Sequence, residues 1–328
     1  MDPRRLHSRL YSSELIGECK MTLALLLALF PIALLIALGA WLRQSNFLAD
    51  SFWPQAERLG YYVLLPSLFV HGLATAHLGD VPVGGMILAL VLSTVTVAIL
   101  LVGSRGIFPG NDAAFTSVFQ GGVRFNNYVG VSAAAGLFGA SGITLAAVAN
   151  AAIVPTVNIL CVLVFARFGP GGRLPVKLIA RQLATNPLIL ACLAGIILQG
   201  TGIGIPRGPE AVLKALGQAS LPLGLLCVGA ALDLKTARSW LKPIGMSSIT
   251  KFVIMPAVTL IACRLIGLQG DAAIAVLLFQ SLPTASSSYI MARQMGGDAP
   301  LMAGIIAGQT LLAALALPVA VITLSSWV

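Results

Sequence analysis

The sequence contains very little charge. Only 9% of its 328 residues are Asp, Glu, Lys or Arg, and 58% are hydrophobic, whereas ordinary soluble domains carry about 25% charged residues. A chain this apolar is typical of a bundle of membrane spans and excludes a soluble globular protein. The formal net charge is +9, but most Lys and Arg residues lie in short loops, where they set topology. We therefore expect the lipid bilayer, and no nucleic acid, as a partner.

Cysteine and enzyme motifs are also scarce. The five cysteines form no CxxC pair, so neither a metal site nor a disulfide framework is predicted. A nucleotide-binding loop is absent from the sequence, so neither a primary pump nor a cofactor is expected. The run Gly139–Gly142 (GASG) resembles the serine motif of rhomboid-like intramembrane proteases, but no histidine follows it. The sequence therefore predicts a protein that is not an enzyme.

Apolar runs long enough to cross a membrane fill most of the chain. With about 20 residues per span, we predict an all-α membrane protein with ten transmembrane helices. They are Met21–Trp41, Ala56–Ala74, Val83–Gly103, Ala113–Phe138, Ile143–Phe168, Leu183–Leu198, Ala211–Leu232, Pro243–Ile266, Ala272–Met295 and Pro300–Ser325. Residues 1–20 are polar and are expected to be a disordered tail, or the product of a start codon upstream of Met21.

The two halves of the chain share regularly spaced residues. At one fixed displacement, residues of the first half recur in the second: Pro31, Gly39 and Pro66 as Pro187, Gly195 and Pro222. Each half holds five spans, an odd number, so the second half must be inverted relative to the first. We predict a first repeat over residues 21–168, a connecting loop over 169–182 and an inverted second repeat over 183–328.

Loop charge predicts the orientation of these spans. If the N-terminus lies outside, the inside loops carry most of the Lys and Arg residues, including the run from Arg167 to Arg181. The positive-inside rule then places both termini outside the cytoplasmic (inner) membrane. The positive charges of residues 1–20 favour the opposite orientation, an objection that disappears if the chain starts at Met21.

Two spans carry residues that interrupt a helix. The fourth contains FQGGVRFNNYVGVSAAAGLFG (119–139) and the ninth contains FQSLPTASSSY (279–289). The residues predicted to break them are Gly121, Gly122, Gly130 and Pro283. Non-helical backbone at membrane depth is tolerated only against protein or a water-filled cavity. Broken helices in matching positions of two halves indicate the binding site of a transporter, so we expect the two spans to unwind and cross near the midplane.

Polar side chains cluster at both breaks. The candidate substrate-binding residues are Arg124, Asn126, Asn127, Ser286, Ser287 and Tyr289. Helix N-termini exposed by a break favour an anion, and the planar fork of arginine suits a carboxylate. The alternative is that the Asn and Ser residues only satisfy freed backbone groups. Arg124 would then clamp the helices by donating to carbonyls at Gly121, Gly122 or Leu282.

One lysine lies inside a predicted span. Lys251 falls within the eighth span, where it either snorkels to the interface or supplies a fixed positive charge near the crossing, in place of a bound sodium. No carboxylate stands beside either break in the sequence, so a sodium cage is not predicted. This weakly favours proton coupling or uniport.

The motifs resemble those of the auxin efflux carrier family in its bacterial form, whose members include organic-anion permeases of the malonate type. The resemblance rests on FQGGVRFNNYVG (119–130) and PTASSSYIMARQMGGDAPL (283–301). It implies an inverted repeat of five plus five spans with crossed fourth and ninth helices. It also implies a scaffold of spans 1, 2, 6 and 7, a moving unit of the other six, and a homodimer.

The chain departs from that family at its first break, where Gly130 is not followed shortly by a proline, and in its short central loop. These departures put auxin itself in doubt as substrate. The sequence favours a secondary transporter of small organic anions, such as dicarboxylates or monocarboxylates, working by alternating access. The alternatives are a passive channel and a membrane receptor for carboxylates that does not transport them.

Overall fold

The computed structural model describes residues 30–75, 81–108, 110–169, 181, 184–232 and 240–325. Within these ranges all regular secondary structure is helical. The predicted tail over residues 1–20, and most of the loop over 169–182, lie outside the described residues. The first predicted span is described from Phe30, as a helix over Phe30–Gln44.

The other helices follow the predicted spans closely. Their bounds are α2 Phe52–Leu59, η1 Gly60–Leu64, α3 Leu65–Ala74, α4 Val83–Gly103, η3 Ser104–Ile107, α5 Asp112–Val123, α6 Asn127–Phe138, α7 Ala140–Phe168, α9 Pro187–Thr201, α10 Arg207–Ala230, α12 Leu241–Ile249, η4 Thr250–Ile254, α13 Met255–Ile266, α14 Gly270–Gln280, α15 Ser287–Met295 and α16 Ala299–Ser325. Five helical stretches of the described chain are long and apolar enough to cross a membrane unaided, whereas the other predicted spans are short or interrupted there.

Two spans contain a short π-helical turn, for which the sequence gives a cause. The turns η1 and η4 each end shortly before a proline, Pro66 in α3 and Pro256 in α13. Proline has no N–H and its ring crowds the carbonyl four residues earlier. The π turn widens the helix at this point, so the span continues instead of stopping.

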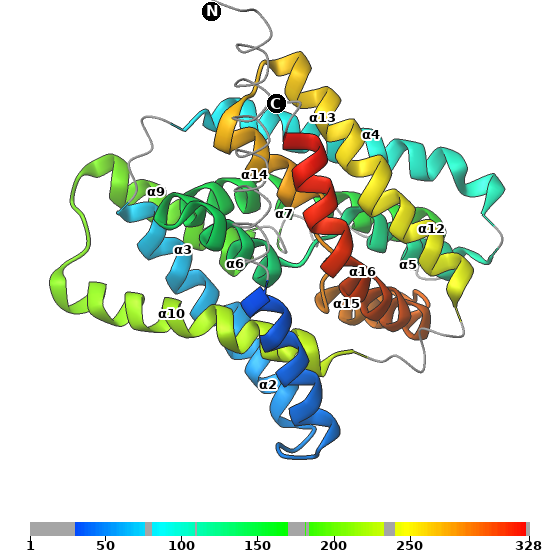
Figure 1. Ribbon diagram of the computed structural model, residues 1–328, viewed down its shortest axis with the longest axis horizontal. Helices are drawn as coiled ribbons and strands as arrows, with labels where there is room; N and C mark the ends of the chain where they lie inside the picture. Colours follow the sequence, from blue (N-terminus) through cyan, green and yellow to red (C-terminus); the bar gives the residue numbers. More distant parts are fainter. Residues whose placement is uncertain are drawn as a thin grey trace, which may run out of the picture.

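The helices form two groups that share α6 and α7 (Figure 1). On one side α3 packs against α9 and α10; on the other, α4, α5, α12, α13, α14 and α16 pack on one another, while α7 contacts both groups. Helix Phe30–Gln44 lies directly against α10. The contact is so close that a Cβ added at Gly39 would lie 2.1 Å from the Leu226 carbonyl oxygen. Gly229 lies equally close to the backbone of Ile36.

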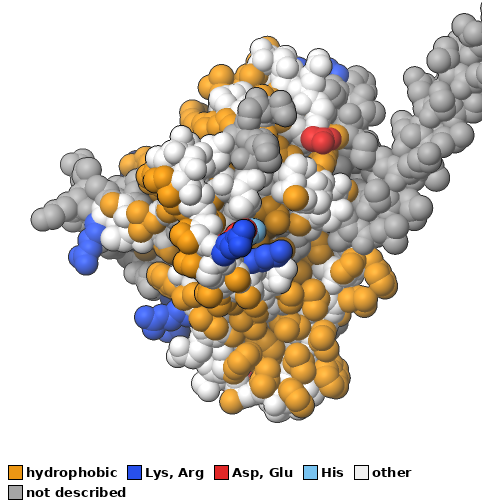
Figure 2. Space-filling model, turned by 90° about the vertical axis from the view of Figure 1, so that its left-hand side faces the viewer, with side chains coloured by type: hydrophobic (Ala, Val, Ile, Leu, Met, Phe, Trp, Pro, Cys, Tyr) orange, Lys and Arg blue, Asp and Glu red, His pale blue; other side chains and the backbone are white. Residues whose placement is uncertain are grey.

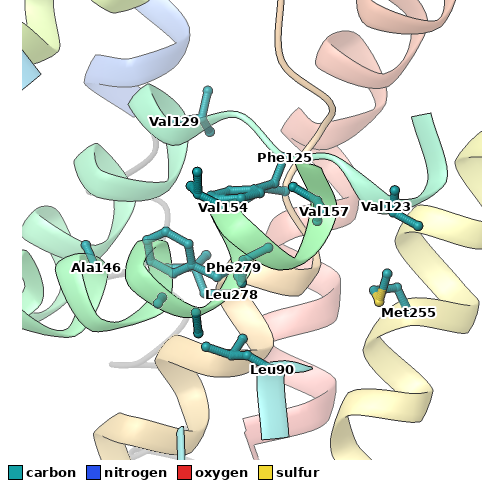
Figure 3. Packing of buried hydrophobic residues seen from close by; sticks show 14 of the residues in the cluster. Leu90, Val123, Phe125, Val129, Ala146, Val154, Val157, Met255, Leu278 and Phe279 are labelled. Atoms are coloured by element: carbon teal, nitrogen blue, oxygen red, sulfur yellow. The ribbon is translucent and has the colours of Figure 1, made fainter. Parts of the chain in front are cut away.

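The hydrophobic core is continuous through the centre of the molecule. Phe125 of the first break faces Phe279 of α14, with ring centroids 6.0 Å apart, and both lie beside Val154 and Val157 of α7 (Figure 3). The outer surface is also apolar: one face carries extensive hydrophobic side chains with few charges (Figure 2). A surface of this kind suits lipid rather than water, as expected for a membrane protein.

Candidate functional site

The fourth and ninth predicted spans are both interrupted, and the two interruptions touch. Residues 124–126 separate α5 from α6, and residues 281–286 separate α14 from α15. The N–H of Asn126 donates to the carbonyl of Pro283 at 2.8 Å. A backbone hydrogen bond therefore joins the two breaks, which is one way that freed backbone groups are satisfied away from water.

Asn126 is at the start of α6 and has a structural role. Its side-chain oxygen accepts hydrogen bonds from the N–H groups of Tyr128 (3.0 Å) and Val129 (3.2 Å). This is an N-cap, which satisfies donors that the helix start leaves free. Only 2% of Asn126 is exposed. The side-chain oxygen of Asn126 therefore satisfies backbone N–H groups freed by the break, as the alternative to substrate binding predicted.

The glycines predicted to break the fourth span flank the break instead of forming it. Gly121 and Gly122 lie in the last turn of α5, and Gly130 lies in the first turn of α6. A Cβ at Gly121 would lie 2.2 Å from the Ser247 hydroxyl, and one at Gly130 would lie 2.5 Å from Leu282. At both positions an added Cβ would crowd the side chain of a neighbouring segment. Pro283, in contrast, lies within the second break itself.

Gln309 of α16 connects both breaks and was not predicted from the sequence. Its side-chain oxygen accepts from the N–H of Thr284 (2.9 Å). Its amide nitrogen donates to the Gly121 carbonyl (3.1 Å) and to the Ser247 hydroxyl (2.9 Å). The side chain is fully buried. The sequence did contain a signal for this role. An uncharged amide inside an apolar span needs hydrogen-bond partners within the protein.

A cavity of about 550 Å³ opens beside the two breaks. It is lined from α2, η1, both breaks, α7 and the start of α15. The lining residues are Pro54, Glu57, Arg58, Tyr61, Tyr62, Leu65, Arg124, Asn126, Asn127, Tyr128, Asn158, Asn186, Ala285, Ser286, Ser287, Ile290 and Met291. The volume falls in the range of sites for small ligands, which is about 300–1,000 Å³. Five of the six predicted substrate-binding residues line this cavity.

Arg124 ties the first break to two other elements through its side chain. One terminal nitrogen donates to Asn158 of α7 at 3.0 Å and to the Met291 sulfur at 3.5 Å. The other donates to the Ser287 hydroxyl at 3.2 Å. The Nε atom has no partner in the described chain. Arg124 thus holds the helices together through side chains, not through the three carbonyls that the sequence suggested.

Arg124 has no acidic partner among the described residues. The ion pairs in that part of the chain lie elsewhere, such as Arg105 with Asp112 at 2.7 Å. Asn127 lies in the same cavity, and its buried side-chain oxygen has no hydrogen-bond partner there. The cavity wall thus includes a positive charge that no acidic side chain of the described chain neutralises.

A carboxylate stands beside the second break, and the sequence analysis missed it. The hydroxyl of Ser286 donates a short hydrogen bond to Glu57 of α2. No acidic residue adjoins either break in the sequence, but the fold brings the Glu57 carboxylate next to the second break. The expectation that neither break has a neighbouring carboxylate is therefore wrong. Arg58 also belongs to α2 and lines the cavity. Glu57 and Ser286 are far apart in the chain, so sequence proximity gave no signal.

Two predicted residues lie away from this cavity. Tyr289 is absent from its lining, and its ring lies 6.0 Å from the Arg293 guanidinium. Lys251, in η4, is completely buried, and its ammonium has no hydrogen-bond partner in the described chain. Complete burial contradicts snorkelling to the interface. The role of Lys251 as a charge near the crossing stays a prediction.

Other polar lining residues missed from the sequence include Tyr61, Asn158 and Asn186. Asn186 caps α9, accepting from the Leu188 N–H at 3.0 Å, and its amide nitrogen donates to the Tyr61 hydroxyl at 3.4 Å. Asn158 lies inside α7, and an amide at that depth is a signal of a functional or buried polar site. No group of three or more His, Cys, Asp or Glu residues suited to a metal occurs in the described ranges.

Comparison with known proteins agrees with these features. Residues 173–321 match the family described as "Membrane transport protein". The chain is 26% identical to the "Putative malonate transporter" of Rhizobium meliloti, over 72% of this chain and 75% of that protein. It is also 26% identical to an uncharacterized transporter of Methanocaldococcus jannaschii, over 55% of this chain and 58% of that protein.

The apolar helices, the paired breaks and these matches define a multi-pass membrane transporter. Residues 173–321 of the chain thus resemble the membrane transport protein family, in agreement with the likeness of its motifs to the auxin efflux carriers.

Proposed function

We propose that this protein is a secondary transporter of small organic anions, and that the cavity beside the two breaks is its substrate site. The observation that carries the proposal is Arg124, which lines this cavity without an acidic partner among the described residues. A charge at the centre of a span is costly, about 2.5–3.5 kcal/mol on insertion scales, and usually marks a functional site. A carboxylate would offset that cost.

The chemistry around Arg124 suits a carboxylate better than a neutral ligand. Its guanidinium is held in place by Asn158 and Ser287, so little side-chain entropy is lost on binding. Asn127 and Tyr61 line the same cavity and add polar groups. The name of the Rhizobium meliloti relative, a malonate transporter, agrees with this class of substrate.

We further propose the architecture that alternating access needs. The two halves would form an inverted repeat of five plus five spans, with the broken fourth and ninth spans crossing at the substrate site. The group containing α3, α9 and α10 would act as the scaffold, and the group containing α5, α12 and α14 would move against it. The hydrogen bond between Asn126 and Pro283 supports a crossing, because it brings the two breaks together. A homodimer in the inner membrane, with both termini outside, completes this proposal.

A passive channel and a receptor that binds carboxylates without moving them are the alternative functions. An intramembrane serine protease is not supported by the sequence, because no histidine follows Ser141 in the chain. A carrier differs from a channel and a receptor because, in vesicles preloaded with unlabelled substrate, it transiently accumulates labelled substrate above equilibrium.

Ligand binding by the purified protein tests the substrate class. A thermal-shift screen against monocarboxylates, dicarboxylates, indole acids and neutral amides should show stabilisation by carboxylates only, since a ligand that binds the folded state raises apparent stability. The variant Arg124→Gln should lose that response. Stabilisation by neutral amides alone would contradict an anion site.

A further inference from the structure

The cavity is lined by a basic and an acidic side chain that do not pair with each other. Arg124 lies at the first break, and Glu57 of α2 lies at the second. Among the described residues, neither side chain forms an ion pair. Each charge therefore remains available to a ligand that occupies the space beside it.

Glu57 is the acidic side chain beside the second break. It accepts the hydrogen bond of Ser286, the residue immediately before α15. The start of a helix is where negative charge is favoured. At the first break the corresponding helix start is capped by the side chain of Asn126. The start of α6 is thus capped by the protein itself, and a carboxylate of the protein already accepts from the side chain of the residue before α15, which leaves Arg124 as the place for one ligand carboxylate.

Glu57 is half-buried, so water screens its charge only in part. A ligand with one carboxylate at Arg124 would present its other end to a wall that includes Glu57 and Tyr61. The Glu57 carboxylate would repel a second negative charge on the ligand, whereas it would accept a hydrogen bond from a donor on the ligand. Arg58 also lines the cavity, but it is exposed, so solvent reduces its effect.

We infer that Glu57 determines substrate specificity: the site takes monoanionic carboxylic acids whose other end donates a hydrogen bond, and it discriminates against fully ionised dicarboxylates. A dicarboxylic acid qualifies in its singly protonated form, because its protonated carboxyl is a donor. This inference rests on the proposed function of the cavity as an anion site.

The ligand pair malonate and malonamate tests this directly. The two have nearly the same shape, but at a pH where malonate is fully ionised, malonamate carries one carboxylate and one amide. We expect the wild-type protein to bind malonamate at least about tenfold more tightly than malonate, as like-charge repulsion inside a binding site requires. Binding is measured by titration calorimetry on the full chain.

The variant Glu57→Gln should reduce that preference to less than about threefold, mainly by tighter binding of malonate. The matched control is Glu210→Gln, since Glu210 lies 3.8 Å from His71 and outside the cavity; it should keep the wild-type preference. Equal affinity of the wild-type protein for malonate and malonamate would overturn the inference and leave the anion site intact. Binding of neither ligand, nor of any other carboxylate, would overturn both.

Discussion

Asn126 and Pro283 are joined by a backbone hydrogen bond of 2.8 Å, although more than 150 positions separate them in the chain. Each residue lies in the non-helical interruption of a predicted span, so the bond joins the two interruptions. The cavity that we assign to the substrate opens beside this bond and is lined in part by Asn126. Movement of either broken helix would therefore alter the cavity directly.

The second break depends on Pro283. Proline removes a backbone donor and disfavours helix at the preceding residue. Replacing Pro283 with Ala should let α14 and α15 approach a continuous helix, giving normal expression and monodisperse protein but poor transport. The control is Pro318→Ala, because Pro318 lies inside the unbroken helix α16. Transport by Pro283→Ala at the wild-type initial rate would show that another residue sets the break.

Arg124 is expected to contribute to both affinity and stability. The variant Arg124→Lys retains the charge but loses the planar fork that bonds Asn158 and Ser287. We expect a folded protein whose affinity for carboxylates falls at least about tenfold, the loss of roughly one charge-assisted hydrogen bond. Arg105→Lys, at the exposed pair with Asp112, is the matched control. Unchanged affinity in a stable Arg124→Gln protein would remove Arg124 from the site.

Gln309 is expected to stabilise the breaks whether or not a ligand is bound. Substitution by Leu leaves the Thr284 N–H, the Gly121 carbonyl and the Ser247 hydroxyl without their buried partner. Each such loss costs about 1–3 kcal/mol, so the melting temperature should fall clearly in the ligand-free protein. Gln199→Leu near the end of α9 is the control. A melting temperature equal to that of wild type would contradict the role assigned to Gln309.

Two glycines test how closely the helices pack. A Cβ at Gly229 would lie 1.8 Å from the Ile36 carbonyl oxygen, whereas one at Gly245 meets nothing within 4 Å. Gly229→Ala should separate α10 from helix Phe30–Gln44 and lower thermal stability. Gly245→Ala should be neutral or stabilising by up to about 1 kcal/mol, because alanine loses less backbone entropy in a helix. Equal melting curves for both variants would contradict this packing.

The helical structure of the described residues and the position of the two breaks could be predicted from the sequence. The prediction Val83–Gly103 coincides with α4, and the Pro283 break lies within residues 281–286. These features depend on local composition and on residues close in the chain, so a sequence carries them. The fourth span was predicted as interrupted, but its glycines serve close packing rather than the break itself.

The parts of the site that the sequence missed depend on contacts between distant segments. In the sequence, Glu57 is an ordinary residue at the end of a predicted span. Only the folded chain places it next to Ser286. In the sequence, Gln309 is only a single amide in the last span. Its contacts with Thr284 and Gly121 arise because α16 packs close to both breaks in the folded chain. Tyr289 lies in α15 between the lining residues Ser287 and Ile290, but its own side chain does not line the cavity. Helix rotation, which sequence alone does not specify, decides this.

The most direct test of the central claim is counterflow in proteoliposomes that contain the purified full-length protein. Vesicles preloaded with unlabelled malonate or malonamate are diluted into a trace of the labelled compound. A carrier predicts transient accumulation of label above equilibrium, which is abolished by Arg124→Gln and retained by Arg105→Lys. A channel gives equilibration without overshoot, and a receptor gives no uptake beyond binding. Either of those results, with protein shown to be folded and inserted, would contradict transport of small organic anions by alternating access.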